Sequence, residues 1–166
     1  LADNRSLIQD REKTFLTATV TAAGTALTVQ SVDSNAWADN DYVIIGEIGT
    51  KNAELMQVNG AVSDGTSLTV DRSGSSSLRY AHATGAPGYR IDFNRIEFSR
   101  NSTDSTSGVS VLTTAEIQPD DLYTRYEDIS NTTGFGFVRF NNQTTSTFSS
   151  YSDGIPYTGY GTKSLG

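Results

Sequence analysis

The sequence lacks most of the side chains that chemistry at a protein site needs. It contains no cysteine and a single histidine, His82. The absence of cysteine excludes disulfides, thiolate metal sites, iron–sulfur clusters and cysteine nucleophiles, and one histidine excludes a three-histidine metal site within one chain. We therefore expect no catalytic residues, no cofactor and no metal, and an enzyme is the least favoured class.

Basic residues and long apolar runs are also scarce. Lys and Arg together number 12 against 19 Asp and Glu, which gives a formal net charge of −7. Proteins that hold nucleic acid need clustered Lys and Arg for the phosphates, so we expect no direct nucleic-acid partner. No apolar run approaches the roughly 20 residues of a membrane helix, so no membrane partner is expected either.

Hydroxyl side chains and glycine are abundant instead. The chain has 20 Ser, 22 Thr and 15 Gly, so Ser and Thr make up about a quarter of its 166 residues. This composition favours strands joined by tight turns and suits a helix bundle poorly. The sequence predicts an all-β protein.

Alternating apolar and polar residues divide the chain into two β units. In the first unit, residues 14–91, the pattern predicts a small β-barrel or sandwich, with residues 14–21 and 26–29 forming a hairpin. The continuous apolar run at residues 42–45 predicts a strand buried on both faces. Further strands are expected at residues 53–58, 67–70 and 88–91.

A short sequence repeat lies within this first unit. Residues 24–29 (GTALTV) match residues 65–70 (GTSLTV) at a separation of 41 residues. Two copies are too few for a solenoid, so the repeat predicts two similar hairpins within one small barrel or sandwich. The alternative is that threonine-rich turns recur by chance in a threonine-rich chain.

The second unit covers residues 92–157. The pattern predicts strands at residues 93–99, 109–112, 123–128, 135–140 and 148–155, joined by polar turns. This spacing fits a β-sandwich.

Segments at the two ends flank these units. Residues 1–13 are expected to form an extended arm or a short helix, either frayed or reaching a neighbouring subunit, with Asp3, Asn4 and Ser6 as possible caps. Residues 158–166 form a C-terminal tail.

Several polar residues are candidates for chemistry, but each has a simpler interpretation. Asp39-Asn40-Asp41 resembles the start of a calcium loop, although Ile44 stands where that loop requires glycine. Glu127 and Asp128 point to opposite faces of a strand, which argues against a paired-carboxylate site. The adjacent Asp120 and Asp121 are interpreted as solvated turn residues, and His82 as a turn histidine that bonds the backbone.

Aromatic residues of the strongest predicted strand offer a stacking platform for bases or sugars. Phe135 and Phe137 share one face of that strand and Phe140 lies nearby. Core packing is the favoured interpretation of these rings.

The second half of the chain resembles a fibronectin type III domain. Residues 123–128 (YTRYED), 134–142 (GFGFVRFNN) and 149–157 (SSYSDGIPY) are similar to three of its strands, and residues 96–100 (IEFSR) to a middle one. The resemblance implies an immunoglobulin/fibronectin type III-like β-sandwich over residues 92–157.

The whole chain resembles a family of tailed-bacteriophage virion structural proteins. The segments that carry this are residues 3–8 (DNRSLI), 41–47 (DYVIIGE), 53–58 (AELMQV), 81–87 (AHATGAP) and 155–160 (IPYTGY). It implies a non-enzymatic component of the virion, assembled in the bacterial host cytoplasm, in multiple copies at the neck, head–tail connector or tail. The implied partners are portal, connector, tail or capsid subunits and further copies of the chain in a homo-oligomeric ring.

Three alternatives remain open at this point. A capsid decoration protein would sit on the outer shell in hundreds of copies. A glycan- or receptor-binding module of a fibre or baseplate would expose aromatics such as Trp37 and Tyr160. An enzyme would require a glycan-hydrolysis activity that Glu47→Gln abolishes.

Overall fold

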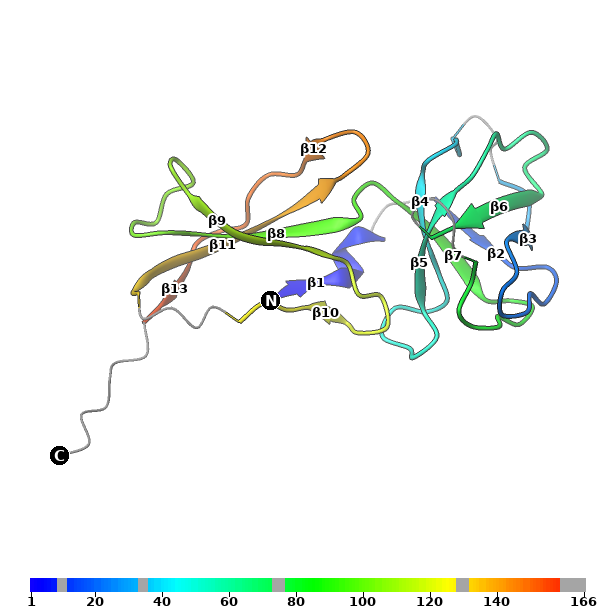
Figure 1. Ribbon diagram of the computed structural model, residues 1–166, viewed down its shortest axis with the longest axis horizontal. Helices are drawn as coiled ribbons and strands as arrows, with labels where there is room; N and C mark the ends of the chain where they lie inside the picture. Colours follow the sequence, from blue (N-terminus) through cyan, green and yellow to red (C-terminus); the bar gives the residue numbers. More distant parts are fainter. Residues whose placement is uncertain (9–11, 33–35, 73–76, 128–131, 159–166) are drawn as a thin grey trace.

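A computed structural model describes residues 1–8, 12–32, 36–72, 77–127 and 132–158. Within these residues the chain forms β-strands and one short 3-10 helix, so the predicted all-β fold is confirmed. Figure 1 shows two units side by side, with a curled sheet at one end and the long strands of a second sheet at the other.

The first unit is a six-stranded antiparallel sheet. Its spatial order is β2 (Lys13–Phe15), β7 (Pro87–Ile91), β4 (Tyr42–Ile45), β5 (Glu54–Val58), β6 (Ser67–Asp71) and β3 (Ala26–Thr28). The sheet curls so that its end strands approach each other, and an isolated bridge joins Leu16 to Val29. The expected hairpin of residues 14–29 is therefore present only in part: the amide of Thr17 donates to Thr28 O and that of Gln30 to Phe15 O, while the ladders of β2 and β3 run to β7 and β6.

The two copies of the sequence repeat pair with each other. Leu27 of β3 lies opposite Leu68 of β6 in an antiparallel register. The amide of Val29 donates to Thr66 O at 2.9 Å, and the amide of Val70 donates to Thr25 O at 2.8 Å. Each bond joins the residues that are equivalent, in the other copy, to those of the second bond, because Val29 corresponds to Val70 and Thr25 to Thr66. The copies therefore form one locally two-fold symmetric pair and not two separate hairpins.

The second unit is built on a sheet with the order β12 (Thr147–Phe148), β11 (Gly134–Asn142), β8 (Arg95–Asn101) and β9 (Ser110–Glu116), with β13 (Ile155–Tyr157) also paired to β11. A small two-stranded sheet, β1 (Ala2–Asp3) with β10 (Tyr123–Thr124), covers part of one face (Figure 1). Within the main sheet, β11 and β8 form the longest ladder.

The last predicted strand is interrupted. Residues 148–155 were expected to form one strand, but they form β12 and the start of β13, with an irregular segment between them. Along this segment the hydroxyls of Ser149 and Ser152 accept hydrogen bonds from the amides of Phe140 and Val138, at 2.9 and 3.0 Å. Serine side chains thus replace the missing ladder bonds at this edge of β11.

The first residues pack into the second unit. After β1, the helix η1 (Asn4–Leu7) buries Leu7, and Asn4 is fully buried. Asn4 Nδ2 donates to the carbonyl oxygens of Gln118 and Asp121, and Asn4 Oδ1 accepts from the Thr124 hydroxyl. The short helix expected within residues 1–13 is thus present, with Asp3 as its cap, since Asp3 Oδ1 accepts from the Arg5 amide. Its start differs from a frayed arm, because a buried amide that satisfies two loop carbonyls holds it in place.

The two units share β4. Val43 and Ile45 face the core inside the curled sheet, while Tyr42 and Ile44 face a second core that contains Leu7, Ile96 and other residues of the second unit. The run at residues 42–45 is buried on both faces, as predicted from the sequence. Its continuous hydrophobicity therefore reflects two cores that meet at one strand.

Candidate interaction surface

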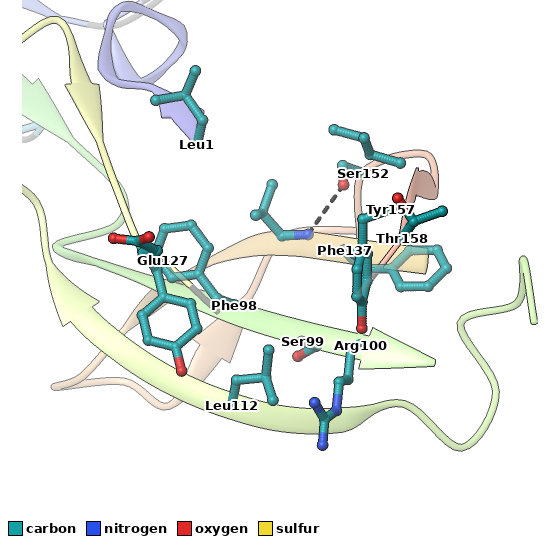
Figure 2. A pocket seen from close by; sticks show the side chains of 14 residues that line it. Leu1, Phe98, Ser99, Arg100, Leu112, Glu127, Phe137, Ser152, Tyr157 and Thr158 are labelled. Atoms are coloured by element: carbon teal, nitrogen blue, oxygen red, sulfur yellow. Dashed lines mark hydrogen bonds between the residues drawn. The ribbon is translucent and has the colours of Figure 1, made fainter. Parts of the chain in front are cut away.

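A groove lies at one end of the second unit (Figure 2). It has a volume of about 410 Å³ and its apolar walls come from β8, β9, β11 and β13. Phe98 at its floor contacts Tyr126 with ring centroids 5.7 Å apart. Arg100 and Glu127 add charged groups to the lining.

Exposed apolar side chains surround this region. Val111 on β9 is 53% exposed and Ile155 on β13 is 62% exposed. Leu1 and Tyr126, which line the groove, are also exposed, whereas the exposed Phe148 lies opposite Asn141 toward the other end of β11. Apolar groups gathered around a groove on a protein surface mark a place suited to contact with another protein.

The face of the sheet that carries Glu97 holds an ion pair. Arg139 Nε donates to Glu97 Oε1 at 2.8 Å, and the Tyr151 hydroxyl donates to the same oxygen at 2.9 Å. The Arg139 guanidinium lies 3.9 Å from the centroid of the Phe148 ring and 4.5 Å from that of Tyr151. Burial raises the pKa of Glu97, but the bonds from Arg139, Tyr151 and Ser99 outweigh it and lower that pKa overall.

A second buried carboxylate organises the first unit. Glu54 is 3% exposed and accepts hydrogen bonds from the amides of Arg79 and Tyr80, from His82 Nε2 and from the Arg72 guanidinium. Burial raises the pKa of Glu54, and these donors together lower it below its ordinary value. The network fixes residues 79–82 against β5.

The histidine expected to bond the backbone has a different main partner. The His82 side chain is buried, and its Nε2 lies 3.1 Å from Glu54 Oε1. Its backbone pairs with Val20 in both directions. Among the described residues no group of three or more His, Asp or Glu side chains is placed to hold a metal ion.

The predicted turn carboxylates make structural contacts. Asp41 accepts from Arg90 Nε at 2.9 Å and from the amide of Ala38 at 2.8 Å. Asp39 accepts from the amide of Gly60 at 2.7 Å. The Tyr89 hydroxyl donates to Glu47 at 3.0 Å, and burial together with this carboxylate raises the pKa of Tyr89 to about 12.

The remaining acidic candidates are divided between the groove and a loop. Glu127 lines the groove and is exposed. Asp120 is exposed, and Asp121 accepts from the amide of Tyr123. Asp128 lies outside the described residues.

The aromatic predictions are partly corrected. Trp37 is 1% exposed and belongs to the first core, so it cannot be the exposed sugar platform expected of a glycan-binding module. Phe137 is buried against Tyr151, as core packing predicted. Phe140 points to the other face of the sheet, where it packs against the second core, and Phe135 is half-buried. Tyr160 lies outside the described residues.

Sequence reasoning missed the residues that organise the two units, namely Glu54, Glu97 and Arg139. A signal was present, because each is a charged residue within a predicted strand, where a charge needs a partner. Nothing in the sequence identifies that partner, since Glu97 and Arg139 are 42 residues apart.

Comparison with protein-family models, curated proteins and solved structures finds no match. No helix among the described residues has the length and apolar character required to cross a membrane.

Proposed function

We propose that this chain is a structural component of a tailed-phage virion, assembled in multiple copies at the neck, the head–tail connector or the tail. The proposal of a virion protein rests on the sequence resemblance to tailed-bacteriophage virion structural proteins. The observation that carries a scaffold role is β4, whose two faces belong to two cores and therefore join both units into one body. A scaffold needs such a body, because a contact made on one unit must fix the position of the other.

The mechanism is geometric. Hydrogen bonds cross between the units from the Gly49 amide to Pro119 O and between the side chains of Tyr42 and Thr144. The exposed apolar groups that line the groove, Leu1, Tyr126 and Ile155, supply contacts to neighbouring portal, connector, tail or capsid subunits. Symmetry multiplies such weak contacts into a stable assembly. The net charge of −7 suits a component beside the DNA path better than one that grips DNA.

Purified virions test this proposal. Mass spectrometry of particles separated from lysate is expected to detect the chain at tens of copies per particle or fewer, and cryo-microscopy is expected to place it in a ring at the neck or tail. The absence of the chain from purified, infectious particles would refute the proposal.

Copy number and binding separate the alternatives. Hundreds of copies on the shell would identify a capsid decoration protein. The groove beside Tyr126 favours testing the glycan- or receptor-binding alternative, because aromatic rings and nearby charges are typical of sugar sites. Saturable glycan binding that Tyr126→Ala abolishes and Tyr80→Ala retains would favour that module, since both tyrosines are exposed and only Tyr126 lines the groove.

A further inference from the structure

The main sheet of the second unit has one covered edge and one open edge. On the covered side, the short strands β12 and β13 and the serines between them pair with β11, and β13 contains Pro156. On the open side, β9 pairs with β8 alone among the described residues. Short strands and proline protect an edge from further pairing, whereas a seven-residue open strand invites it.

The alternation of hydrogen bonds shows which groups of β9 are open. The backbone N–H and C=O groups of Val138 and Phe140 hydrogen-bond to the hydroxyls and amides of Ser152 and Ser149. These backbone groups therefore point away from β8. The backbone groups of the residues between them, such as Arg139, therefore bond to β8, at Glu97 and every second residue from it. The backbone groups of Ile96 and Phe98 then point the other way and bond to β9.

The same alternation continues into β9. Ala115 and Thr113 lie opposite Ile96 and Phe98, so their backbone groups point toward β8. The backbone N–H and C=O of Thr114 consequently point outward, with no described strand to receive them.

The composition of β9 does not discourage pairing. The strand reads SVLTTAE, with no Lys, Arg or Pro, and its single charge is Glu116 at the end. A register shift between Phe98 and Ser99 of β8 places a bulge at Leu112, which limits the regular part of β9 to residues 113–116.

We propose that β9 pairs antiparallel with β9 of a second copy of this chain, about a two-fold axis at Thr114. Thr114 exchanges two backbone hydrogen bonds with Thr114 of the second copy, and Thr113 lies opposite Ala115. Each Glu116 lies two residues from the axis, so the two carboxylates are about 13 Å apart along the strands. No like charges are brought opposite each other, and the exposed Val111 lies beside the contact.

Self-pairing is favoured because the described sheet offers one open edge only. A head-to-tail contact needs two different complementary surfaces, while a two-fold contact uses the same surface twice. The pairing would join the two sheets into one continuous sheet through the dimer. This contact is argued from the edge alone and does not depend on the virion role.

A single introduced cysteine tests the register. The chain has no cysteine, so any disulfide in a one-cysteine variant must link two copies. Under mild oxidation, Thr114→Cys is expected to cross-link rapidly, because directly opposed residues in a hydrogen-bonded pair lie about 5.5 Å apart, within disulfide range. The matched control is Thr145→Cys, an exposed threonine in the turn between β11 and β12, which is expected to cross-link slowly.

Sedimentation equilibrium tests the contact without cross-linking. The full chain is expected to form a dimer, and Thr114→Lys is expected to weaken it about tenfold or more because two ammonium groups meet at the axis. Thr114→Val keeps the β-branched shape and is expected to dimerise as the parent does. Circular dichroism establishes that each variant is folded.

Two results would overturn the proposal. One is a folded parent chain that stays monomeric at high micromolar concentration. The other is a dimer that Thr114→Lys leaves intact while Thr114→Cys cross-links no faster than Thr145→Cys, which would place the contact elsewhere.

Discussion

At the scale of single residues, a buried carboxylate organises each of the two units. Glu54 lies at the centre of the first, where its two oxygens accept bonds from two backbone amides and two side chains. A buried charge is tolerated only when it is paired and hydrogen-bonded in this way. The folded state therefore depends on the ionised form of this side chain.

Replacement of Glu54 by glutamine should destabilise the protein. The substitution removes the charge that faces Arg72 and directs an NH₂ donor toward groups that are themselves donors. We expect the free energy of unfolding to fall by about 2–4 kcal/mol. Urea denaturation measures this, and the control is Glu12→Gln at an exposed position, which should change it by less than about 0.5 kcal/mol. An equal effect of both variants would contradict the role assigned to the network.

The same carboxylates predict acid sensitivity. The pKa values of Glu54 and Glu97 are lowered in the folded state relative to 4.5, so the unfolded chain takes up protons first as the pH falls. Their contribution to stability is complete above pH about 4.5 and is lost as the pH falls through the folded-state pKa values. Urea unfolding across that range should show a decline that is shallower in the double variant Glu54→Gln/Glu97→Gln. A decline of unchanged slope would assign the acid sensitivity to other groups.

At the scale of elements, the sequence predicts strands better than it predicts their partners. The buried run at residues 42–45 and the strand at residues 135–140 were located correctly, because their periodicity is a local property. The pairing of β2 with β7 was missed, since these strands lie more than 70 positions apart and no local pattern connects them. The split of residues 148–155 was missed because the sequence pattern does not show how Ser149 and Ser152 bond to β11. Serines in a regular strand and serines whose hydroxyls accept from the neighbouring strand give the same pattern.

The candidate surface was predicted less well than the fold. Trp37 was named as an aromatic that a glycan-binding module would expose, yet its ring lies in the first core. The groove depends on the approach of β8, β9 and β13, which are brought together only by tertiary pairing. A site made from strand ends of distant segments leaves no short motif in the sequence.

Arg139 should hold the segment after β12 onto β11. Its planar guanidinium stacks on Phe148 and Tyr151 while it donates to Glu97, and lysine cannot reproduce both contacts. Arg139→Lys should lower hydrogen-exchange protection at the amides of Ser149 and Ser152, which donate to β11, by the equivalent of about 1–2 kcal/mol.

The matched control for this change is Arg125→Lys, whose side chain is 67% exposed. Protection at the two serine amides should be unchanged in that variant. If Arg139→Lys also leaves it unchanged, the serine bonds alone hold the segment.

At the scale of the whole molecule, the shared strand β4 makes two sheets behave as one body. Tyr42 and Ile44 project into the core of the second unit, while Val43 and Ile45 stay inside the curled sheet. The second core also contains Leu7 from the start of the chain. Damage to that core should therefore be felt in the first core, through a strand that belongs to both.

Leu7→Ala tests this coupling, because Leu7 is 5% exposed in the second core while the only tryptophan, Trp37, lies in the first. The cavity should cost about 2–4 kcal/mol. If the molecule unfolds as one unit, the urea midpoint from Trp37 fluorescence should fall together with that from far-ultraviolet circular dichroism. Leu1→Ala is the control, since Leu1 is 62% exposed and its loss should leave both midpoints nearly unchanged. A fluorescence midpoint that stays at its original value while the dichroism transition splits would mean that the two cores unfold independently, and a scaffold that transmits position through β4 would then be untenable.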